Sequence, residues 1–242
     1  MNNFILKLIA IVVMFIDHFA VASYRMIGLE KYKVLRAIGR TSFPIFAFLL
    51  VEGFRNTRNR WRYLLSMLIL ACISEIPYDL VFATWELRHK LMNVFFTLSI
   101  SLFVLIIGEE VRKGFNLVIT SLVNITLMAI SMYIAWKYNF DYGAFGPLLV
   151  YMIYYSAEIV MPHIKQASIY NVVAVLAIFM WFCIHDIYYN KYDEVNGFPA
   201  CILLYFYNHQ RGKYIIPKYV FYFFYPVHLM LLYFLRKYYF NM

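Results

Sequence analysis

Apolar residues in this chain gather into nine runs that are separated by short polar stretches. The runs cover residues 4–24, 37–54, 62–83, 93–108, 115–136, 143–160, 168–188, 197–207 and 219–236. A helix needs about 20 apolar residues to cross a bilayer, and most of the runs approach that length. The eighth run has only 11 residues, so it predicts a half-helix or a re-entrant piece. The pattern predicts an all-α, polytopic integral membrane protein with about nine transmembrane helices, or eight if the short run is re-entrant.

The runs follow one another without a soluble domain between them, and no period of 20–50 residues repeats. We therefore expect residues 1–242 to form a single transmembrane domain. The composition agrees, because 64% of the 242 residues are hydrophobic and the mean hydropathy is +0.66. Soluble domains are less apolar than this. The three cysteines lie inside apolar runs, so they predict neither a disulfide framework nor a metal site.

The formal net charge is +9, and most basic residues lie between the apolar runs. Basic residues in that position anchor loops to membrane lipid headgroups, so we expect no nucleic-acid partner. The densest basic cluster is made of Arg55, Arg58, Arg60 and Arg62. Because basic loops stay in the cytoplasm, this cluster predicts a cytoplasmic loop and a cytoplasmic amino terminus. The loop at residues 88–90 is then external.

The first apolar run contains two ionisable residues, Asp17 and His18. A charge at bilayer depth costs roughly 2.5–3.5 kcal/mol on insertion scales, so such residues are candidates for function. Neighbours on a helix point about 100° apart, so His18 needs a partner on another helix or a wet cavity. The alternative is a structural polar pair that holds helices together.

Further polar residues occur in other runs at the same predicted membrane depth as Asp17 and His18. Up-and-down threading brings them to the half of the membrane opposite the arginine-rich loop. This clustering predicts one polar chamber, and it favours function over scattered structural pairs. The residues are Arg40, Glu75, Asp79, Asn93, Asp141, Tyr142, His185 and Asp186.

Two pairs in this set are spaced four residues apart, which puts both members on one helix face. Glu75 and Asp79 flank Pro77, which opens or bends a helix, so they predict a cavity wall whose carboxylate orients His18 or Arg40. Arg36 and Arg40 form the second pair. We expect Arg40 to pair with an acid such as Asp17, Glu75 or Asp79, in a structural or a substrate-binding role.

Two further stretches carry candidate chemistry. The segment from Glu52 to Arg60 combines guanidinium groups with amide and hydroxyl side chains, and arginine recognises phosphate in a planar fork. It predicts either a phosphate clamp or ordinary anchoring to lipid. In the last run, His228 stands two residues after Pro226, and we expect a buried histidine that is satisfied by a carbonyl group.

Together these motifs resemble the TraX family, and they occur in the family order along nearly the whole chain. Tyr78 departs from the family pattern, which has Phe there. The stretches are Ile16-Asp17-His18, Gly39 to Phe48, Glu52-Gly53-Phe54 with Thr57-Arg58, Ser74 to Asp79, Asn93 to Thr97, Asp141-Tyr142-Gly143, Arg211-Gly212-Lys213 and Tyr225 to His228. The family is named for a conjugation protein that acetylates the amino terminus of pilin. It is grouped with membrane acyltransferases such as heparan glucosaminide acetyltransferase.

The resemblance implies a multi-pass enzyme of the bacterial cell membrane that transfers an acetyl group from cytosolic acetyl-CoA to an acceptor. That acceptor is a peptide amine, a sugar hydroxyl or a cell-envelope polymer, and the sequence permits an oligomer. His18 is the implied catalytic centre, as a general base or an acyl carrier. The full set of expected site residues is His18, Asp17, Arg40, Glu75, Asp79 and Asn93 for catalysis; Glu52, Arg55, Thr57 and Arg58 for the coenzyme; and Asp141, Tyr142 and His228 in support.

Acyl transfer fits these residues, because it needs a base for the acceptor proton and a stabiliser for the oxyanion. A neutral histidine that is oriented by a carboxylate supplies the first, and Arg40 or Asn93 supplies the second. The alternative function is a secondary transporter or channel in which Asp17, His18, Glu75 and Asp79 relay protons or ions. A transporter of this size favours an internal repeat, which the sequence lacks.

Overall fold

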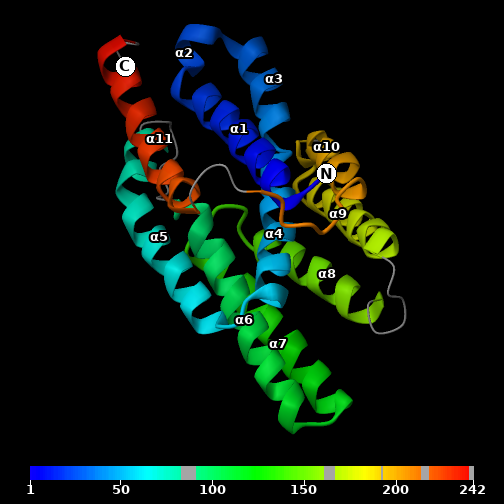
Figure 1. The fold of residues 1–242 in the computed structure, drawn as a ribbon. Coiled ribbons are helices and arrows are strands. Elements are labelled where there is room, and N and C mark those ends of the chain that lie inside the picture. The colour runs from blue at the N-terminus through cyan, green and yellow to red at the C-terminus, as the bar shows by residue number, and fades with distance from the viewer. Residues whose placement is uncertain (83–90, 161–166, 192, 214–217, 240–242) are drawn as a thin grey trace.

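The computed structural model describes residues 1–82, 91–160, 167–191, 193–213 and 218–239, and the regular structure of these residues is helical (Figure 1). One isolated bridge joins Met92 and Phe140. The helices are α1 (Asn3–Ala22), α2 (Tyr24–Ile27), α3 (Leu29–Gly39), α4 (Ser42–Asn56), α5 (Arg60–Phe82), α6 (Val94–Gly114), α7 (Leu117–Lys137), α8 (Phe145–Val160), α9 (Ala167–Tyr189), the 3-10 helix η1 (Glu194–Gly197), α10 (Pro199–Tyr205) and α11 (Lys218–Tyr239).

Six helical stretches among the described residues are long and apolar enough to cross a membrane. They are Asn3–Ala22, Leu29–Asn56, Arg60–Phe82, Val94–Gly114, Leu117–Lys137 and Ile169–Tyr189. The expected all-α membrane architecture is thus found, but the count of nine transmembrane helices is not confirmed. The eighth apolar run forms only the seven-residue α10. At 1.5 Å per residue this helix spans about 10 Å, so it is a half-helix.

The helical structure around the second apolar run begins before the run itself, and a turn interrupts it. Helix α3 ends at Gly39, helix α4 begins at Ser42, and a turn at Arg40 and Thr41 separates them. By contrast, helix α5 continues through Pro77 as far as Phe82. Hydrophobic patterning alone does not indicate this turn, because Arg40 and Thr41 lie inside the apolar run 37–54.

Asparagine side chains begin three of the helices. Asn2 accepts a hydrogen bond from the Ile5 amide, Asn93 from the Phe95 amide and Asn116 from the Ile119 amide. Each bond satisfies one of the amide groups that a helix leaves without a partner at its start. Asn93 therefore fixes where α6 leaves the loop that follows α5.

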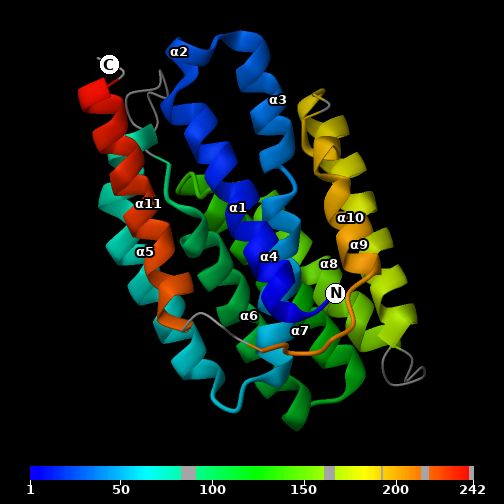
Figure 2. The same ribbon diagram turned by 45° about the horizontal axis from the view of Figure 1, so that its top comes forward.

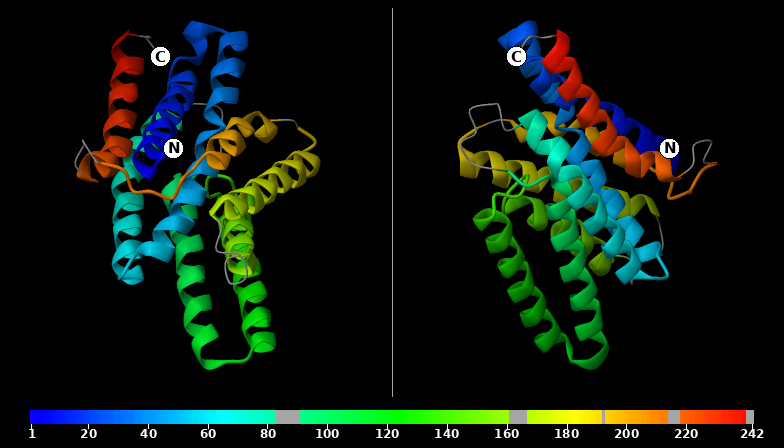
Figure 3. Two further views of the ribbon diagram at one scale, coloured as in Figure 1. Left: turned by 45° about the vertical axis from the view of Figure 1, so that its right-hand side comes forward. Right: turned by 90° about the vertical axis from the view of Figure 1, so that its left-hand side faces the viewer.

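The helices pack around two hydrophobic clusters. The larger one is built mainly from α4, α6, α8, α9 and α10, and the smaller one from α1, α5 and α11. Three partly buried residues, Phe46, Val94 and Phe95, pack against both clusters. They mark a seam between the clusters, and α6 and α7 extend away from it as a long hairpin (Figure 3).

The chain after α10 runs in an extended form across the amino-terminal end of α1 toward α11 (Figure 2). The Asn3 amide donates a hydrogen bond to the Gln210 carbonyl at 2.8 Å, and the Asn3 side chain reaches the Tyr207 hydroxyl at 3.3 Å. We refer to residues 206–213 as the crossing segment. The predicted external loop at residues 88–90 lies outside the described residues.

Candidate functional site

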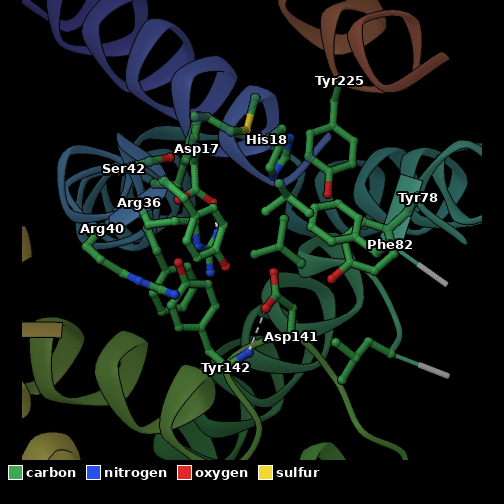
Figure 4. Close-up of a pocket in the computed structure, with 18 residues that line it drawn as sticks. Asp17, His18, Arg36, Arg40, Ser42, Tyr78, Phe82, Asp141, Tyr142 and Tyr225 are labelled. Carbon is green, nitrogen blue, oxygen red and sulfur yellow. Dashed lines mark hydrogen bonds and ion pairs between the residues drawn. The ribbon is translucent and has the colours of Figure 1, made fainter. Parts of the chain in front are cut away.

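Two cavities lie along the seam between the hydrophobic clusters. The smaller, of about 160 Å³, is the inner chamber, and the larger, of about 620 Å³, is the outer cavity. Both are lined by Met14, Phe46, Val94 and Tyr225, so they meet at these four side chains. The inner chamber is shown in Figure 4, and its other lining residues are Asp17, His18, Val21, Tyr32, Arg36, Gly39, Arg40, Ser42, Phe43, Tyr78, Phe82, Leu91, Asp141 and Tyr142.

His18 lines the inner chamber and has its partner on another helix, as expected. Its Nδ1 lies 2.7 Å from Nε2 of His228 on α11, and both rings are buried. Nδ1 of His228 lies 2.8 Å from the Phe224 carbonyl oxygen, which can only accept a hydrogen bond. Neutral His228 therefore carries its proton on Nδ1 and accepts at Nε2, so His18 donates from Nδ1. This leaves Nε2 of His18 with a free lone pair.

This pairing confirms that His228 is satisfied by a carbonyl group, and it corrects the expected orientation of His18. A carboxylate was predicted to orient the His18 ring, but the described residue that holds its Nδ1 is His228. The reason lies in the packing of α1 against α11, which brings the two rings together with their planes nearly parallel, at an angle of 6°.

Asp17 faces the α3 helix rather than His18. One of its carboxylate oxygens accepts a hydrogen bond from Arg36, and the other, Oδ1, is buried without a hydrogen-bond partner among the described residues. Gly39 makes this approach possible, because a Cβ atom there would overlap the Asp17 carboxylate. Asp17 and Arg36 therefore form the acidic and basic edge of the chamber beside His18.

Arg40 does not pair with any of the three acids that the sequence suggested. Its guanidinium lies 2.9 Å from the Glu194 carboxylate in η1. Asp186 holds η1 in place, because its two oxygens accept hydrogen bonds from the Glu194 and Val195 amides at 3.1 Å. The turn between α3 and α4 directs Arg40 toward η1, which is why the prediction from helix faces was wrong.

Glu75 and Asn93 bind each other outside the chamber. The Asn93 side chain donates to Glu75 at 2.6 Å and to the Ala71 carbonyl at 2.8 Å. Both donor hydrogens of the amide are thus used within the wall of the protein. Asp79 is likewise absent from the lining of either cavity. The structure therefore does not bring these three expected residues to His18.

Asp141 and Tyr142 enter the chamber from the loop between α7 and α8. The Asp141 amide donates to the Met92 carbonyl at 2.9 Å, and the Thr97 hydroxyl donates to the Asp141 carbonyl at 2.6 Å. These bonds hold the loop so that the Asp141 side chain points into the chamber (Figure 4). Tyr142 has a positive φ of 63° and stacks on Phe43, with ring centroids 3.7 Å apart.

Two carboxyl groups near the chamber, Asp141 in the loop between α7 and α8 and Glu194 in η1, have raised pKa values. Burial raises the pKa of Asp141 to about 6, although Arg40 and Arg36 act in the opposite direction. Burial likewise raises the pKa of Glu194 to about 7, again against Arg40 and Arg36. Desolvation exceeds the attraction of the arginines in both cases, since it disfavours the charged form of a buried acid.

The outer cavity opens at the end of the molecule that carries the amino terminus and the crossing segment. Its deep wall is apolar, with Ile11, Leu49, Met67 and Leu98 among its residues, and two cations, Lys7 and Arg211, line its polar part. The other lining residues are Asn3, Leu50, Glu52, Gly53, Asn56, Thr57, Tyr63, Phe95, Tyr207, His209, Phe221 and Tyr222.

The four residues predicted to bind the coenzyme divide into two groups. Glu52 and Thr57 line the outer cavity, whereas Arg55 and Arg58 do not. The Arg55 guanidinium lies 5.6 Å from the centre of the Tyr170 ring, and Arg58 is exposed. The structure instead brings two basic residues, Lys7 and Arg211, to this cavity.

A hydrogen-bonded row fixes the crossing segment over the outer cavity. Nε2 of His209 lies 2.8 Å from the Asn171 side-chain oxygen, and Nδ1 lies 3.4 Å from the Glu52 carboxylate. Asn171 also donates to the Tyr207 carbonyl at 2.6 Å. The row ties the segment to α4 and α9, so it positions Arg211 at the cavity.

Several residues of the two cavities escaped the sequence analysis. Arg36 was found only as the neighbour of Arg40, and Tyr225 only as the first letter of a motif. Glu194, His209 and Asn171 carry no local pattern that marks them, because the partners of their side chains are more than 30 residues away in the chain. The Arg211-Gly212-Lys213 motif was the signal that pointed to the crossing segment.

Comparisons with known proteins agree over almost the full length of the chain. The model of the TraX protein family matches residues 3–236. The probable fimbrial assembly protein FimC, serogroup H1, of Dichelobacter nodosus is 31% identical over 245 residues, which cover 96% of this chain and 94% of that relative. No solved structure matches the chain.

Proposed function

The chain belongs to the TraX family, and from this premise we propose that it is an acyltransferase of the bacterial cell membrane. It transfers an acetyl group from acetyl-CoA to an acceptor amine or hydroxyl. The observation that carries the proposal is the free Nε2 of His18 in a buried chamber that meets a second, larger cavity.

His18 acts as the general base in this proposal. Its Nδ1–H is committed to His228, so the lone pair on Nε2 is available for the proton of the acceptor. As the acceptor attacks the acetyl carbon, its proton passes to Nε2, and the resulting imidazolium still donates to His228. A positioned base of this kind contributes about 10²–10⁴-fold to the rate.

The outer cavity fits the donor. Coenzyme A combines a charged phosphate portion with a thin, uncharged arm, and the cavity combines Lys7 and Arg211 with an apolar depth. We propose that the two cations bind the phosphates and that the arm extends along the cavity. The thioester then reaches the four residues where the cavities meet, with the acetyl group toward His18.

The acceptor enters from the inner chamber. The name of the relative from Dichelobacter nodosus refers to fimbrial assembly, which favours an amine on a pilus protein over a sugar hydroxyl as the acceptor. The chamber has about 160 Å³, close to an engineered cavity of about 150 Å³ that holds one benzene molecule. It therefore admits the reacting end of an acceptor rather than a folded domain.

The test measures release of free coenzyme A thiol from acetyl-CoA by purified protein in detergent. We expect turnover by the wild type and a loss of about 10²–10⁴-fold in His18→Ala. Thermal unfolding and coenzyme A binding serve as controls that the variant is folded. Full turnover by folded His18→Ala would remove His18 from the mechanism. Absence of turnover by the wild type, together with proton or solute flux in liposomes, would instead support a transporter.

A further inference from the structure

Tyr225 has a buried hydroxyl group that the fold does not use. The residue is 2% exposed, and its hydroxyl has no hydrogen-bond partner among the described residues. Buried hydroxyl groups in native proteins are nearly always hydrogen-bonded, because an unmade bond costs stability. A hydroxyl group in this state points to a partner that arrives with the substrate.

The position of Tyr225 is where the donor and the acceptor would meet. It lines both the inner chamber and the outer cavity. Its ring packs edge-on against His18, with centroids 5.8 Å apart, and against Phe95, with centroids 4.8 Å apart. These contacts fix the ring, and its hydroxyl points into the chamber between His18 and Asp141 (Figure 4).

The other donors that the sequence suggested for an oxyanion each have a partner within the fold. Arg40 lies 2.9 Å from Glu194, and the Asn93 amide donates to Glu75 and to the Ala71 carbonyl. Arg36 is likewise engaged by Asp17. A phenol is a hydrogen-bond donor at neutral pH, and the Tyr225 hydroxyl is a fully buried donor at the chamber that has no partner among the described residues.

We propose that Tyr225 is a catalytic residue that donates a hydrogen bond to the carbonyl oxygen of the acyl thioester. This inference rests on the proposed acetyl transfer. When the acceptor attacks the carbonyl carbon, a new C–N or C–O bond forms and the π electron pair moves to the oxygen. The oxyanion accepts the hydrogen bond, and the proton stays on Tyr225. The C–S bond then breaks, coenzyme A leaves as thiolate, and His18 Nε2 holds the proton of the acceptor.

The cost of keeping this hydroxyl unpaired has a physical rationale. A donor that is already desolvated and aimed at the developing charge needs no reorganisation at the moment of reaction. Removing one such donor from an acyl-transfer enzyme costs about 10²–10³-fold in kcat. The same removal should not harm the fold, because an unsatisfied buried hydroxyl is replaced by an apolar ring edge.

The experiment compares Tyr225→Phe with wild type and with Tyr151→Phe in detergent. Tyr151 is also 2% exposed, lies outside both cavities, and donates to the Asn124 carbonyl at 3.5 Å. We expect Tyr225→Phe to lose about 10²–10³-fold in kcat for acetyl-CoA, with a much smaller change in KM. Its melting temperature should equal or exceed that of the wild type. Tyr151→Phe should keep the wild-type kcat.

The outcomes separate this role from the proposed function. If the wild type transfers acetyl groups and Tyr225→Phe loses less than about tenfold in kcat, the role of Tyr225 is wrong and the proposed function stands. A Tyr225→Phe protein that melts lower or fails to fold would make the hydroxyl structural and overturn the inference as well. A wild type that transfers no acetyl group would overturn both.

Discussion

Several side chains of the inner chamber have one fixed partner and one polar atom left over. Asp17 binds Arg36 with one oxygen and keeps Oδ1 unpaired, and His18 binds His228 with Nδ1 and keeps Nε2. Tyr225 keeps its hydroxyl. The fixed partners prevent these groups from turning away, so the leftover atoms are preorganised for a ligand. At this scale the chamber is a set of oriented groups rather than a network that satisfies itself.

The titration of Asp141 is a prediction at the same scale. Its pKa in the fold is about 6 against 3.8 for an ordinary aspartate. The Asp141 carboxyl therefore binds its proton more tightly in the folded state, and this binding stabilises the fold. The full stabilisation is present below about pH 4 and is lost as the pH rises through about 6. We expect the melting temperature to fall less between pH 5 and pH 8 in Asp141→Asn than in the wild type. The wild type should lose roughly 1–3 kcal/mol more unfolding free energy than the variant over this pH range.

Asp193→Asn is the matched control for this measurement, because Asp193 is exposed in the same polar region. It should keep the wild-type dependence on pH. Burial raises the pKa of Glu194 to about 7, and the charge of Asp141 adds to that rise, so the difference between the curves reports Asp141 together with its effect on Glu194. Parallel curves for Asp141→Asn and the wild type would contradict the raised pKa.

At the scale of elements, the interruption between α3 and α4 shapes the chamber. Arg36 in the last turns of α3 faces Asp17, whereas Arg40 in the turn itself faces η1. The two guanidiniums are thus held by acids from different parts of the chain. The close approach of α3 to α1 depends on Gly39, where a side chain would overlap Asp17.

Gly39→Ala should therefore displace Asp17 and push α3 away from α1. Gly114 is a matched control, because it is also the last residue of a helix and a Cβ atom there would meet no other atom. We expect a lower melting temperature and lower acetyl transfer in Gly39→Ala, with a cost of about 1–3 kcal/mol for the overpacking. Gly114→Ala should behave as the wild type, and equal behaviour of the two variants would contradict the close approach.

Two elements that are distant in the sequence supply the cations of the outer cavity, Lys7 from α1 and Arg211 from the crossing segment. If they bind the phosphates of the donor, Lys7→Ala and Arg211→Ala should each weaken coenzyme A binding about tenfold at low salt. The loss should shrink as salt is added. Arg58→Ala removes an exposed charge outside the cavity and serves as the control. Stronger weakening by Arg58→Ala would return the phosphate site to the arginine-rich loop.

At the scale of the whole molecule, the site lies in the seam between two hydrophobic clusters. The outer cavity starts at the end that carries the arginine-rich loop, and the inner chamber lies toward the other end. Their junction is formed largely by apolar side chains, Met14, Phe46 and Val94. A continuous row of charged groups through the molecule, which an ion relay would need, is thus interrupted there.

The two ends of the molecule also allow its orientation in the membrane to be tested. We expect the loop at Asn59 to be cytoplasmic and Asn190, which is exposed after α9, to be external. In a background where the exposed Cys72 and Cys183 are changed to Ala, cysteine at position 59 should resist an impermeant thiol reagent in intact cells. Cysteine at position 190 should react. The opposite pattern would put the outer cavity on the external face and remove cytosolic acetyl-CoA as its ligand.

Hydrophobic patterning was sufficient for the helical class and for most helix positions. A membrane helix must satisfy its own backbone and present apolar side chains, and both requirements are local. The ends of helices were less certain, because α6 continues past the apolar run through Glu109 and Arg112 to Gly114. Charged residues in a last turn are compatible with a helix, and basic ones are favoured there, so hydrophobicity alone ended it too early.

For the candidate site as well, some features follow from the sequence and others only from the tertiary structure. The sequence alone determined that ionisable residues such as Asp17, His18 and Arg40 lie in apolar runs at one depth, because run lengths and threading set depth. Only the tertiary structure decided their partners, which are Arg36, His228 and Glu194 rather than Glu75 or Asp79. Depth depends on the order of residues within one helix. Pairing depends on the rotation and approach of two helices, and side chains far apart in the chain fix both.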